Sequence, residues 1–139
     1  MSEYQLPEVW ENPVNMGGAW GGLNQPTAGA RFEQKLPRGD KPLQVYSLGT
    51  PNGVKVTILL EELRELGIEA ADYDLYKIAI GEGDQFGSDF VALNPNSKIP
   101  VLLDQSGSEP ISVFESANIL LYLAEKFGQL IPTDATKRT

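Results

Sequence analysis

Three short segments of this chain combine small polar residues with proline and glycine, residue types that suit binding of a small peptide-like anion. They are Thr50-Pro51-Asn52-Gly53, Asn94-Pro95-Asn96-Ser97-Lys98-Ile99-Pro100 and Phe114-Glu115-Ser116. Hydroxyl, carboxamide and backbone N–H groups hold such a ligand through hydrogen bonds without changing protonation. The chain contains no cysteine and no histidine. Redox or transfer chemistry at these segments would therefore need a reactive group from the ligand, and a thiol would supply one.

The composition excludes several classes of function. Without cysteine there is no disulfide, no thiolate metal site and no cysteine nucleophile, and without histidine a Ser-His-Asp triad is impossible. The same absences argue against zinc, so we expect no metal. The formal net charge of −8 argues against a nucleic-acid partner, for which a basic surface is typical. We interpret this charge as a solubility feature.

Membrane-spanning and secretory segments are not expected. No apolar run reaches the roughly 20 residues that a membrane-spanning helix needs. The segment Met1-Ser2-Glu3-Tyr4 lacks the basic and apolar regions of a secretory signal. We therefore expect no membrane partner and a cytoplasmic location.

The first 42 residues differ in composition from the rest. Prolines and glycines recur there, and no helical or alternating apolar period persists. We interpret residues 1–42 as an extended arm on the protein or on a partner subunit, anchored by its aromatic residues Tyr4, Trp10, Trp20 and Phe32. The glycine-rich run at 17–22 is not a phosphate loop, because no strand precedes it and no Gly-Lys-Ser/Thr follows.

Regular structure is predicted from residue 43 onward. Apolar periodicity and turn residues predict strands over 43–48, 73–78, 99–103 and 111–113, and helices over 51–66, 88–93 and 115–127. Thr50 suits the N-cap of the first helix and Pro51 its first position. Ser88 or Asp89 would cap the second helix, and Glu115 or Ser116 would open the third. Gly67 and Gly128 would end the first and third helices.

The order βαβαββα predicts an α/β fold of the thioredoxin-like kind. Its first half implies parallel strands joined by a right-handed crossover, and its second half adds a hairpin that turns at 104–109. Residues 81–87 are expected to form a loop. The first helix presents a broad apolar face made by Val54, Val56, Ile58, Leu59, Leu60, Leu63 and Leu66. The third helix is expected to bury Ile119, Leu120, Leu123 and Phe127.

Residues 43–131 resemble the N-terminal, glutathione-binding domain of cytosolic glutathione transferases. The segment 94–100 matches the family pattern Asn-Pro-x-Gly-x-Ile-Pro, with Ser97 in place of the usual glycine. Glu115-Ser116-Ala117-Asn118-Ile119 and Tyr122-Leu123 match its Glu-Ser-x-x-Ile…Tyr-Leu helix start. The segment Thr50 to Val56 is narrower and is similar to the bacterial Nu class of glutathione-dependent disulfide reductases, and to the related yeast nitrogen-regulator prion protein. The family also has an all-helical second domain, so the resemblance implies that residues 132–139 form a linker toward a domain absent from this chain.

The resemblance implies roles for individual residues. It implies a cis Ile99–Pro100 bond, with the backbone of Ile99 binding the cysteinyl part of glutathione; an ordinary proline at a strand start is the alternative. Ser116 and nearby N–H groups would bind the γ-glutamyl carboxylate and Glu115 the ammonium, unless the two residues are a plain capping pair. Thr50 and Asn52 would be the catalytic residues that contact the thiolate, and Pro51 between them would also contact glutathione; a helix cap at Thr50 and a turn residue at Asn52 are the alternative.

Weaker assignments concern Asn24, Gln85 and Lys98. The Nu-class resemblance implies glutathione contacts for Asn24 and Gln85, and Lys98 is placed to reach the glycyl carboxylate; solvated side chains are the alternative for all three. Tyr46 lies inside a strand and is expected to point into the core or to the other face of the sheet, so no catalytic role is assigned to it.

The resemblance therefore implies a glutathione-dependent disulfide-bond oxidoreductase whose reactive sulfurs arrive with its ligands, and a homodimer as the assembly; no metal is expected. A non-catalytic protein-interaction module on the same scaffold is the main alternative. A conjugating transferase or a peroxidase, acting on an electrophile at the same glutathione site, is the other.

Overall fold

The computed structural model describes residues 5, 6, 8, 9, 21 and 29–138. Its strands are β1 (Leu43–Ser47), β2 (Tyr73–Lys77), β3 (Val101–Asp104) and β4 (Ile111–Phe114), and its α-helices are α1 (Pro51–Glu65), α2 (Ser88–Leu93) and α3 (Ser116–Phe127). Three single turns of 3-10 helix complete it: η2 (Glu69–Ala71), η3 (Asp84–Phe86) and η4 (Ala135–Lys137). Among the described residues, no helix has the length and apolar character needed to cross a bilayer.

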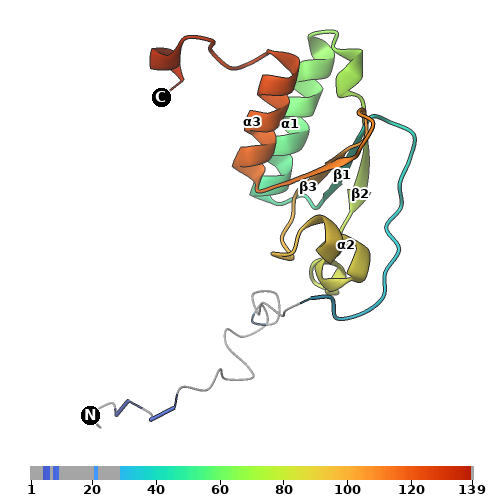
Figure 1. Cartoon of the computed structure of the whole chain (residues 1–139), viewed down its shortest axis with the longest axis vertical. Helices are drawn as coiled ribbons and strands as arrows, with labels where there is room; N and C mark the ends of the chain where they lie inside the picture. Colours follow the sequence, from blue (N-terminus) through green and yellow to red (C-terminus); the bar gives the residue numbers. More distant parts are fainter. Residues whose placement is uncertain (1–4, 7, 10–20, 22–28, 139) are drawn as a thin grey trace.

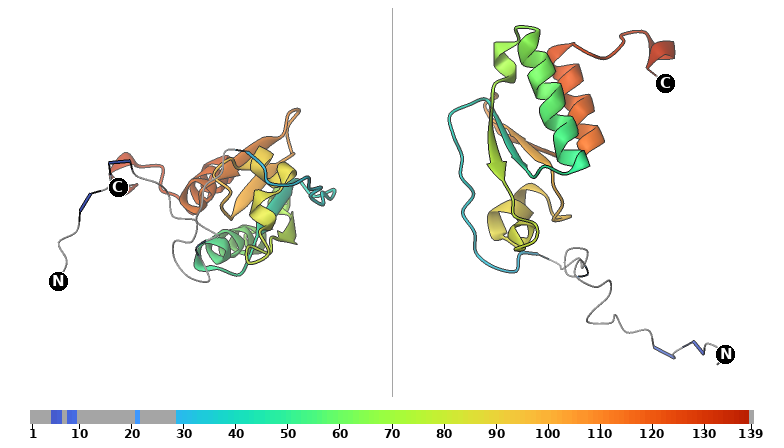
Figure 2. Two further views of the ribbon diagram at one scale, coloured as in Figure 1. Left: turned by 90° about the horizontal axis from the view of Figure 1, so that it is seen from below. Right: turned by 180° about the vertical axis from the view of Figure 1, so that it is seen from behind.

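The four strands form one mixed sheet in the order β2-β1-β3-β4. β1 and β2 are parallel, whereas β3 is antiparallel to both of its neighbours. Helices α1 and α3 cover one face side by side, and α2 lies toward the other (Figures 1 and 2). The predicted order βαβαββα and the thioredoxin-like fold are confirmed.

Two apolar clusters sandwich the sheet. Leu43, Val45, Leu102 and Val113 join α1 and α3 on one face, while Tyr46, Val101 and Leu103 join α2 on the other. Residues 43–48 alternate apolar and polar side chains in the sequence, yet all five residues of β1 are buried. A central strand covered on both faces has no solvated side. The polar side chain of Gln44 is tolerated in this buried strand because its hydrogen bonds are made. Its carboxamide accepts from the N–H of Gly39 and donates to the carbonyl of Lys41, both at 2.8 Å.

Helix α1 begins as the sequence predicts and buries less than predicted. The Thr50 Oγ1 accepts from the backbone N–H of Gly53, and Gly67 follows the helix with φ +78°. Val56, Leu60 and Leu63 are buried, but Val54, Ile58 and Leu66 are 42%, 57% and 54% exposed. The broad apolar face predicted for this helix is therefore only partly buried, because the sheet and α3 cover only part of the helix surface.

Helix α2 lacks the predicted side-chain cap. Gly87 is its N-cap, and Ser88 is already the first helical residue. The Ser88 hydroxyl instead accepts from the N–H of Gln34 at 2.9 Å. The prediction that Ser88 or Asp89 caps the helix is therefore wrong, because contacts with a distant segment use these side chains. The loop predicted at 81–87 also contains the single turn η3.

The second half of the sheet differs from prediction only at its edges. β3 starts at Val101 rather than at residue 99, and β4 extends to Phe114. In α3, Ile119 and Leu123 are buried, whereas Leu120 and Phe127 are half-buried. Gly128 ends the helix with φ +62°, as predicted.

A buried carboxylate fastens α3 to the sheet. Asp104, 2% exposed at the end of β3, accepts from the Tyr122 hydroxyl at 2.7 Å and from the Lys126 ammonium at 2.8 Å. The Ser106 hydroxyl and N–H donate to its other oxygen. Burial acts to raise the pKa of Asp104, but the hydrogen bonds from Lys126, Ser106 and Tyr122 outweigh it and bring the pKa to about 2. Burial and the adjacent carboxylate raise the pKa of Tyr122 to about 12.

Candidate functional site

Helices α1 and α3 begin at the same end of the sheet (Figure 1). The strand register explains why, because Val101 lies opposite both Tyr46 and Phe114. The residues that follow β1, precede β3 and follow β4 therefore meet at one edge. The first N–H groups of a helix lack intrahelical partners and carry partial positive charge. Two adjacent helix starts make this end of the molecule suited to a negatively charged ligand, and all three segments singled out from the sequence lie here.

The start of α1 is packed tightly against the end of β1. A Cβ on Gly53 would lie 2.2 Å from the Leu48 carbonyl oxygen and 2.4 Å from the Ser47 Oγ, so only glycine fits. Thr50 caps the helix, and its hydroxyl oxygen stands 3.3 Å from the Gly53 nitrogen. Asn52 is exposed, and its Oδ1 accepts from the Lys55 ammonium at 2.9 Å. Thr50 and Asn52 therefore lie at one helix start, as expected.

The segment 94–100 is a loop organised by a buried asparagine. Asn94 is fully buried, and its Nδ2 donates to the carbonyl of Lys98 at 2.7 Å while its Oδ1 accepts from the N–H of Asn96 at 3.0 Å. Ser97 has φ +54°, in the left-handed region that favours glycine, where the family pattern has one. The Ile99–Pro100 bond is cis, as predicted.

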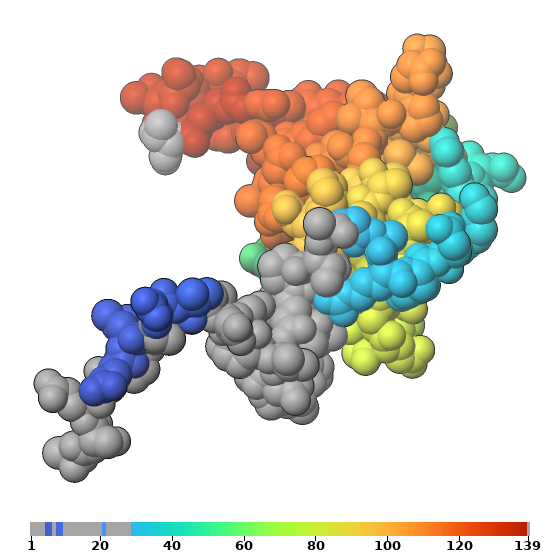
Figure 3. All heavy atoms as spheres, turned by 60° about the horizontal axis from the view of Figure 1, so that its bottom comes forward, coloured from blue at the N-terminus to red at the C-terminus, as the bar shows by residue number. Residues whose placement is uncertain are grey.

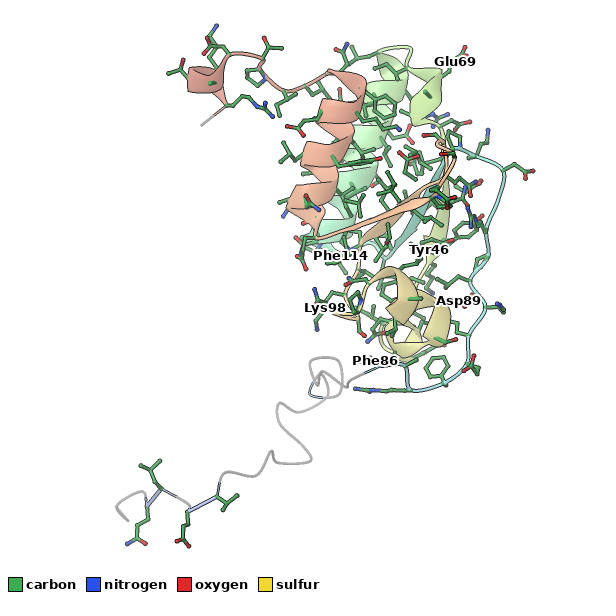
Figure 4. All side chains as sticks on the ribbon, viewed as in Figure 1. Tyr46, Glu69, Phe86, Asp89, Lys98 and Phe114 are labelled. Atoms are coloured by element: carbon green, nitrogen blue, oxygen red, sulfur yellow. The ribbon has the colours of Figure 1, made fainter. Side chains whose placement is uncertain are left out.

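This loop places Ile99 and Lys98 beside the two helix starts. Ile99 precedes Val101, the first paired residue of β3, so it lies at the rim of the sheet rather than inside it. Lys98 is exposed and lies beside α2, close to the end of the sheet where α1 and α3 begin (Figure 4). Sequence reasoning assigned no role to Asn94, although a polar run after a short helix is a turn signal.

Glu115 has an unusual backbone conformation at the start of α3. Its φ is +69° and its ψ is 119°, and its side chain makes no capping hydrogen bond. The interpretation of Glu115 and Ser116 as a plain capping pair is therefore wrong for Glu115. Non-glycine residues held in such regions cost about 1–3 kcal/mol and cluster at binding sites. Glu115, which is exposed, immediately precedes the first turn of α3, and the half-buried Ser116 is its first residue.

Gln85 lies in η3 and is only 2% exposed. Its Nε2 donates to the Ile80 carbonyl at 3.3 Å, and its buried Oε1 has no hydrogen-bond partner in the described part of the chain. A buried unpartnered oxygen is rare and calls for a donor. A glutathione contact for Gln85 stays a prediction. Asn24, the other carboxamide expected at the site, lies outside the described residues, as do Tyr4, Trp10 and Trp20.

Residues 31–41, called the strap here, run past η3 and α2 and then along the side of the sheet that carries β2 (Figures 1 and 3). The N–H of Arg31 donates to the Phe86 carbonyl at 2.8 Å, and the Phe32 carbonyl accepts from the N–H of Ser88 at 2.9 Å. The Arg31 guanidinium lies 3.5 Å from the centre of the Phe86 ring. The ring of Phe32 is 44% exposed, so this residue is attached by its backbone and not, as expected, by a buried aromatic side chain.

Two further hydrogen bonds attach the strap, one to η3 and one to α2. The Gln34 Nε2 donates to the Asp84 carbonyl at 3.1 Å, and the N–H of Leu36 donates to the Asp89 carboxylate at 3.0 Å. A Cβ on Gly87 would lie 2.3 Å from the Gln34 Oε1. Figure 4 shows Phe86 and Asp89 on the side of the molecule where the strap runs. The strap therefore fixes the backbone on both sides of Gln85.

Tyr46 is not part of the site. Its ring is buried on the α2 face and stacks on Tyr76 with the ring centres 5.4 Å apart. Its hydroxyl donates to the Pro37 carbonyl at 2.8 Å. Burial and the neighbouring Tyr76 raise the pKa of Tyr46 to about 12. The phenol stays neutral and bound to the strap, in agreement with the sequence-based interpretation.

Two hollows lie along α1. One, of about 350 Å³, separates the first turns of the helix from the edge strand β2 and is lined by Leu48, Val54, Thr57 and Leu75 among others. A larger one, of about 590 Å³, lies near the other end of α1 around Arg64 and Asp72 and is remote from the three segments. In the part of the chain that the structure describes, no group of three or more metal-ligating side chains is present.

A thioredoxin-like sheet with an anion-favouring site at two helix starts and a cis-proline loop defines the class of this domain. Residues 51–126 match the family model for the glutathione S-transferase N-terminal domain. The chain belongs to this family.

Named relatives are close in sequence. A GST-like protein of Streptococcus mutans is 66% identical over 139 residues, which cover 100% of this chain and 53% of the relative. The disulfide-bond oxidoreductase YghU of Escherichia coli is 57% identical over 136 residues, covering 98% of this chain and 47% of that protein. This chain thus spans about half the length of these curated relatives.

A solved structure is similarly close. The crystal structure of glutathione transferase YghU from Streptococcus pneumoniae, complexed with glutathione, has a TM-score of 0.92 and 68% sequence identity. The match covers 98% of this chain and 52% of that one.

Proposed function

We propose that this chain is the glutathione-binding part of a glutathione-dependent disulfide-bond oxidoreductase. The observation that carries the proposal is the meeting of two helix starts and the 94–100 loop at one edge of the sheet. It is supported by 57% identity to a protein named as a disulfide-bond oxidoreductase and by 68% identity to a transferase solved with glutathione.

The ligand's charges match the groups at this edge. The γ-glutamyl carboxylate binds Ser116 and the first N–H groups of α3, and the exposed Glu115 carboxylate binds the adjacent ammonium. The backbone of Ile99, at the rim before Pro100, pairs with the cysteinyl unit as an added strand would. Lys98 reaches the glycyl carboxylate. Gln85 and Asn24 supply further carboxamide contacts.

The thiolate then lies at the start of α1. Thr50 and Asn52, on either side of Pro51, donate hydrogen bonds to the sulfur, and the helix dipole favours its anionic form. The thiolate attacks one sulfur of a disulfide, forming a mixed disulfide and expelling a thiolate that takes up a proton. A second glutathione thiolate attacks the glutathionyl sulfur of the mixed disulfide. The products are glutathione disulfide and a second thiol, so two electrons pass from two glutathiones to the substrate.

Calorimetric titration of the chain with glutathione and with glutathione disulfide tests the binding step. We expect saturable binding, and Ser116→Ala should weaken it because a hydrogen bond to a carboxylate is lost. Ser108→Ala, on the turn between β3 and β4, is the matched control and should bind as the unmodified chain does. Absence of heat with both ligands would refute the proposal.

The proposal extends to the domain boundaries, assembly and location. We propose residues 43–131 as the binding domain, 1–42 as an arm and 132–139 as a linker, which limited proteolysis tests through the positions of its first cuts. We also propose a homodimer, with Ile111 on β4 and Leu121 on α3, 52% and 44% exposed, as candidate contacts. Light scattering of a clean monomer would contradict it. A cytoplasmic location follows from the need for reduced glutathione, and cell fractionation tests it.

A further inference from the structure

Lys55 and Asn52, both exposed on the first turns of α1, are joined by a hydrogen bond. The Lys55 ammonium donates to the Asn52 Oδ1 at 2.9 Å. The two residues are three positions apart on α1, a spacing that makes helical side chains neighbours. An ammonium group has donors and no acceptor, so the carboxamide must turn its oxygen toward Lys55 and its Nδ2–H₂ group away from it. The contact therefore favours the side-chain orientation in which the Asn52 Nδ2–H₂ group points away from Lys55 and can donate to another group.

This contact lies on the flank of α1 that faces α3. The opposite flank is marked by Val54 and Thr57, which line the hollow beside β2. Helical spacing places Asn52, Lys55 and Leu59 together on the other side. Leu59 packs against the apolar cluster to which α3 contributes. Asn52 and Lys55 therefore lie on the flank of α1 opposite the hollow beside β2, at the end of α1 that meets the edge of the sheet described above.

We propose that Lys55 is a positioning residue that presents the Asn52 Nδ2–H₂ group to the sulfur of bound glutathione. The inference rests on the proposed function and adds a residue to it. Without Lys55 the carboxamide is free to turn its oxygen toward the sulfur anion, and that orientation repels the anion. A donor locked in place needs no reorganisation when the thiolate forms. The hydrogen bond from a cation also polarises the carboxamide and strengthens its N–H groups as donors.

The first experiment measures the carboxamide itself, without ligand. Nitrogen-15 relaxation of the Asn52 side chain, assigned by its loss in Asn52→Ala, reports how restricted the Nδ2 group is. We expect greater motion in Lys55→Met and native-like restriction in Lys55→Arg, which keeps a cationic donor. Lys137→Met, on the distant turn η4, removes the same charge and should change nothing. Equal restriction in the native chain and in Lys55→Met would overturn the inference.

The second experiment measures the bound thiol. The ultraviolet absorbance of the thiolate, followed against pH with glutathione bound, gives its pKa. Lys55→Met should raise that pKa and slow disulfide reduction about three- to tenfold, the range expected for one hydrogen bond. Lys55→Arg should restore both properties. In the Asn52→Ala background, Lys55→Met should have no further effect, because Lys55 acts through Asn52.

The outcomes separate this inference from the proposed function. If the native chain binds no glutathione, the proposed function fails and the inference fails with it. If glutathione binds and Lys55→Met leaves the thiol pKa unchanged, only the role of Lys55 is overturned. If Lys55→Met has the same effect with and without Asn52, its charge acts directly on the ligand and the positioning role is wrong.

Discussion

Replacing the buried carboxylate of Asp104 should remove a defined part of the pH dependence of folding. The hydrogen bonds from Lys126, Ser106 and Tyr122 overcome the effect of burial and lower the pKa of Asp104 from its usual 3.8 to about 2. At 1.36 kcal/mol per pH unit, this difference corresponds to about 2.5 kcal/mol of stability at neutral pH. Because the pKa is lower in the folded state, the contribution is complete above pH 3.8 and is lost as the pH falls toward 2.

The test compares urea unfolding of the native chain and Asp104→Asn at pH 7 and at pH 3. With the two pKa values above, about half of the 2.5 kcal/mol remains at pH 3. The difference in unfolding free energy between the two proteins should therefore shrink by about 1 kcal/mol between pH 7 and pH 3. Asp40→Asn, an exposed aspartate on the strap, is the matched control. A difference that stays constant with pH would refute the electrostatic account of this cluster.

Three further substitutions probe the frame of the site. Ser97→Gly should raise the melting temperature, because φ +54° costs a non-glycine residue about 1 kcal/mol; a fall would show that the serine side chain outweighs the strain. Asn94→Ala should destabilise the chain by about 2–3 kcal/mol in urea unfolding, because it removes two hydrogen bonds in a buried loop; a cost below about 1 kcal/mol would contradict this role. Gln34→Ala should speed amide hydrogen exchange at Gly87 while leaving Leu60 unchanged, since only the strap contact is lost; equal acceleration at both amides would indicate global destabilisation instead.

Much of the fold could be predicted from local signals. The Thr50-Pro51 pair and Gly67 delimit α1 because capping chemistry depends only on neighbouring residues. The element order and the cis bond before Pro100 also agree with prediction. Each of these features is decided within a few residues of sequence, or by a motif that a family shares.

The features that escaped prediction depend on distant contacts. Ser88 looks like a helix cap until the strap, more than fifty positions earlier in the chain, takes up its hydroxyl. Val54 and Ile58 follow the helical period but remain 42% and 57% exposed. The buried state of Gln85 and the cluster around Asp104 likewise join segments whose proximity only the folded chain determines.

At the site itself, the residues expected to face the ligand were easier to predict than the hydrogen bonds that hold those residues in place. The sequence motifs single out Thr50, Ile99 and Ser116 as candidate binding residues, and the strand register places their segments at one edge of the sheet. It does not show that Asn94 organises the loop or that Lys55 contacts Asn52. These supporting contacts are hydrogen bonds of polar residues that also have ordinary surface explanations.

The direction in which the chain enters and leaves the domain matters for its practical use. The described chain at residues 29–31 lies beside η3, near the edge where the helices begin, whereas η4 lies beyond the opposite end of α3 (Figure 1). A surface attachment or fluorescent fusion placed after η4 would leave the anion-favouring edge facing the solution. The same attachment placed just before residue 29 would stand next to that edge and obstruct it.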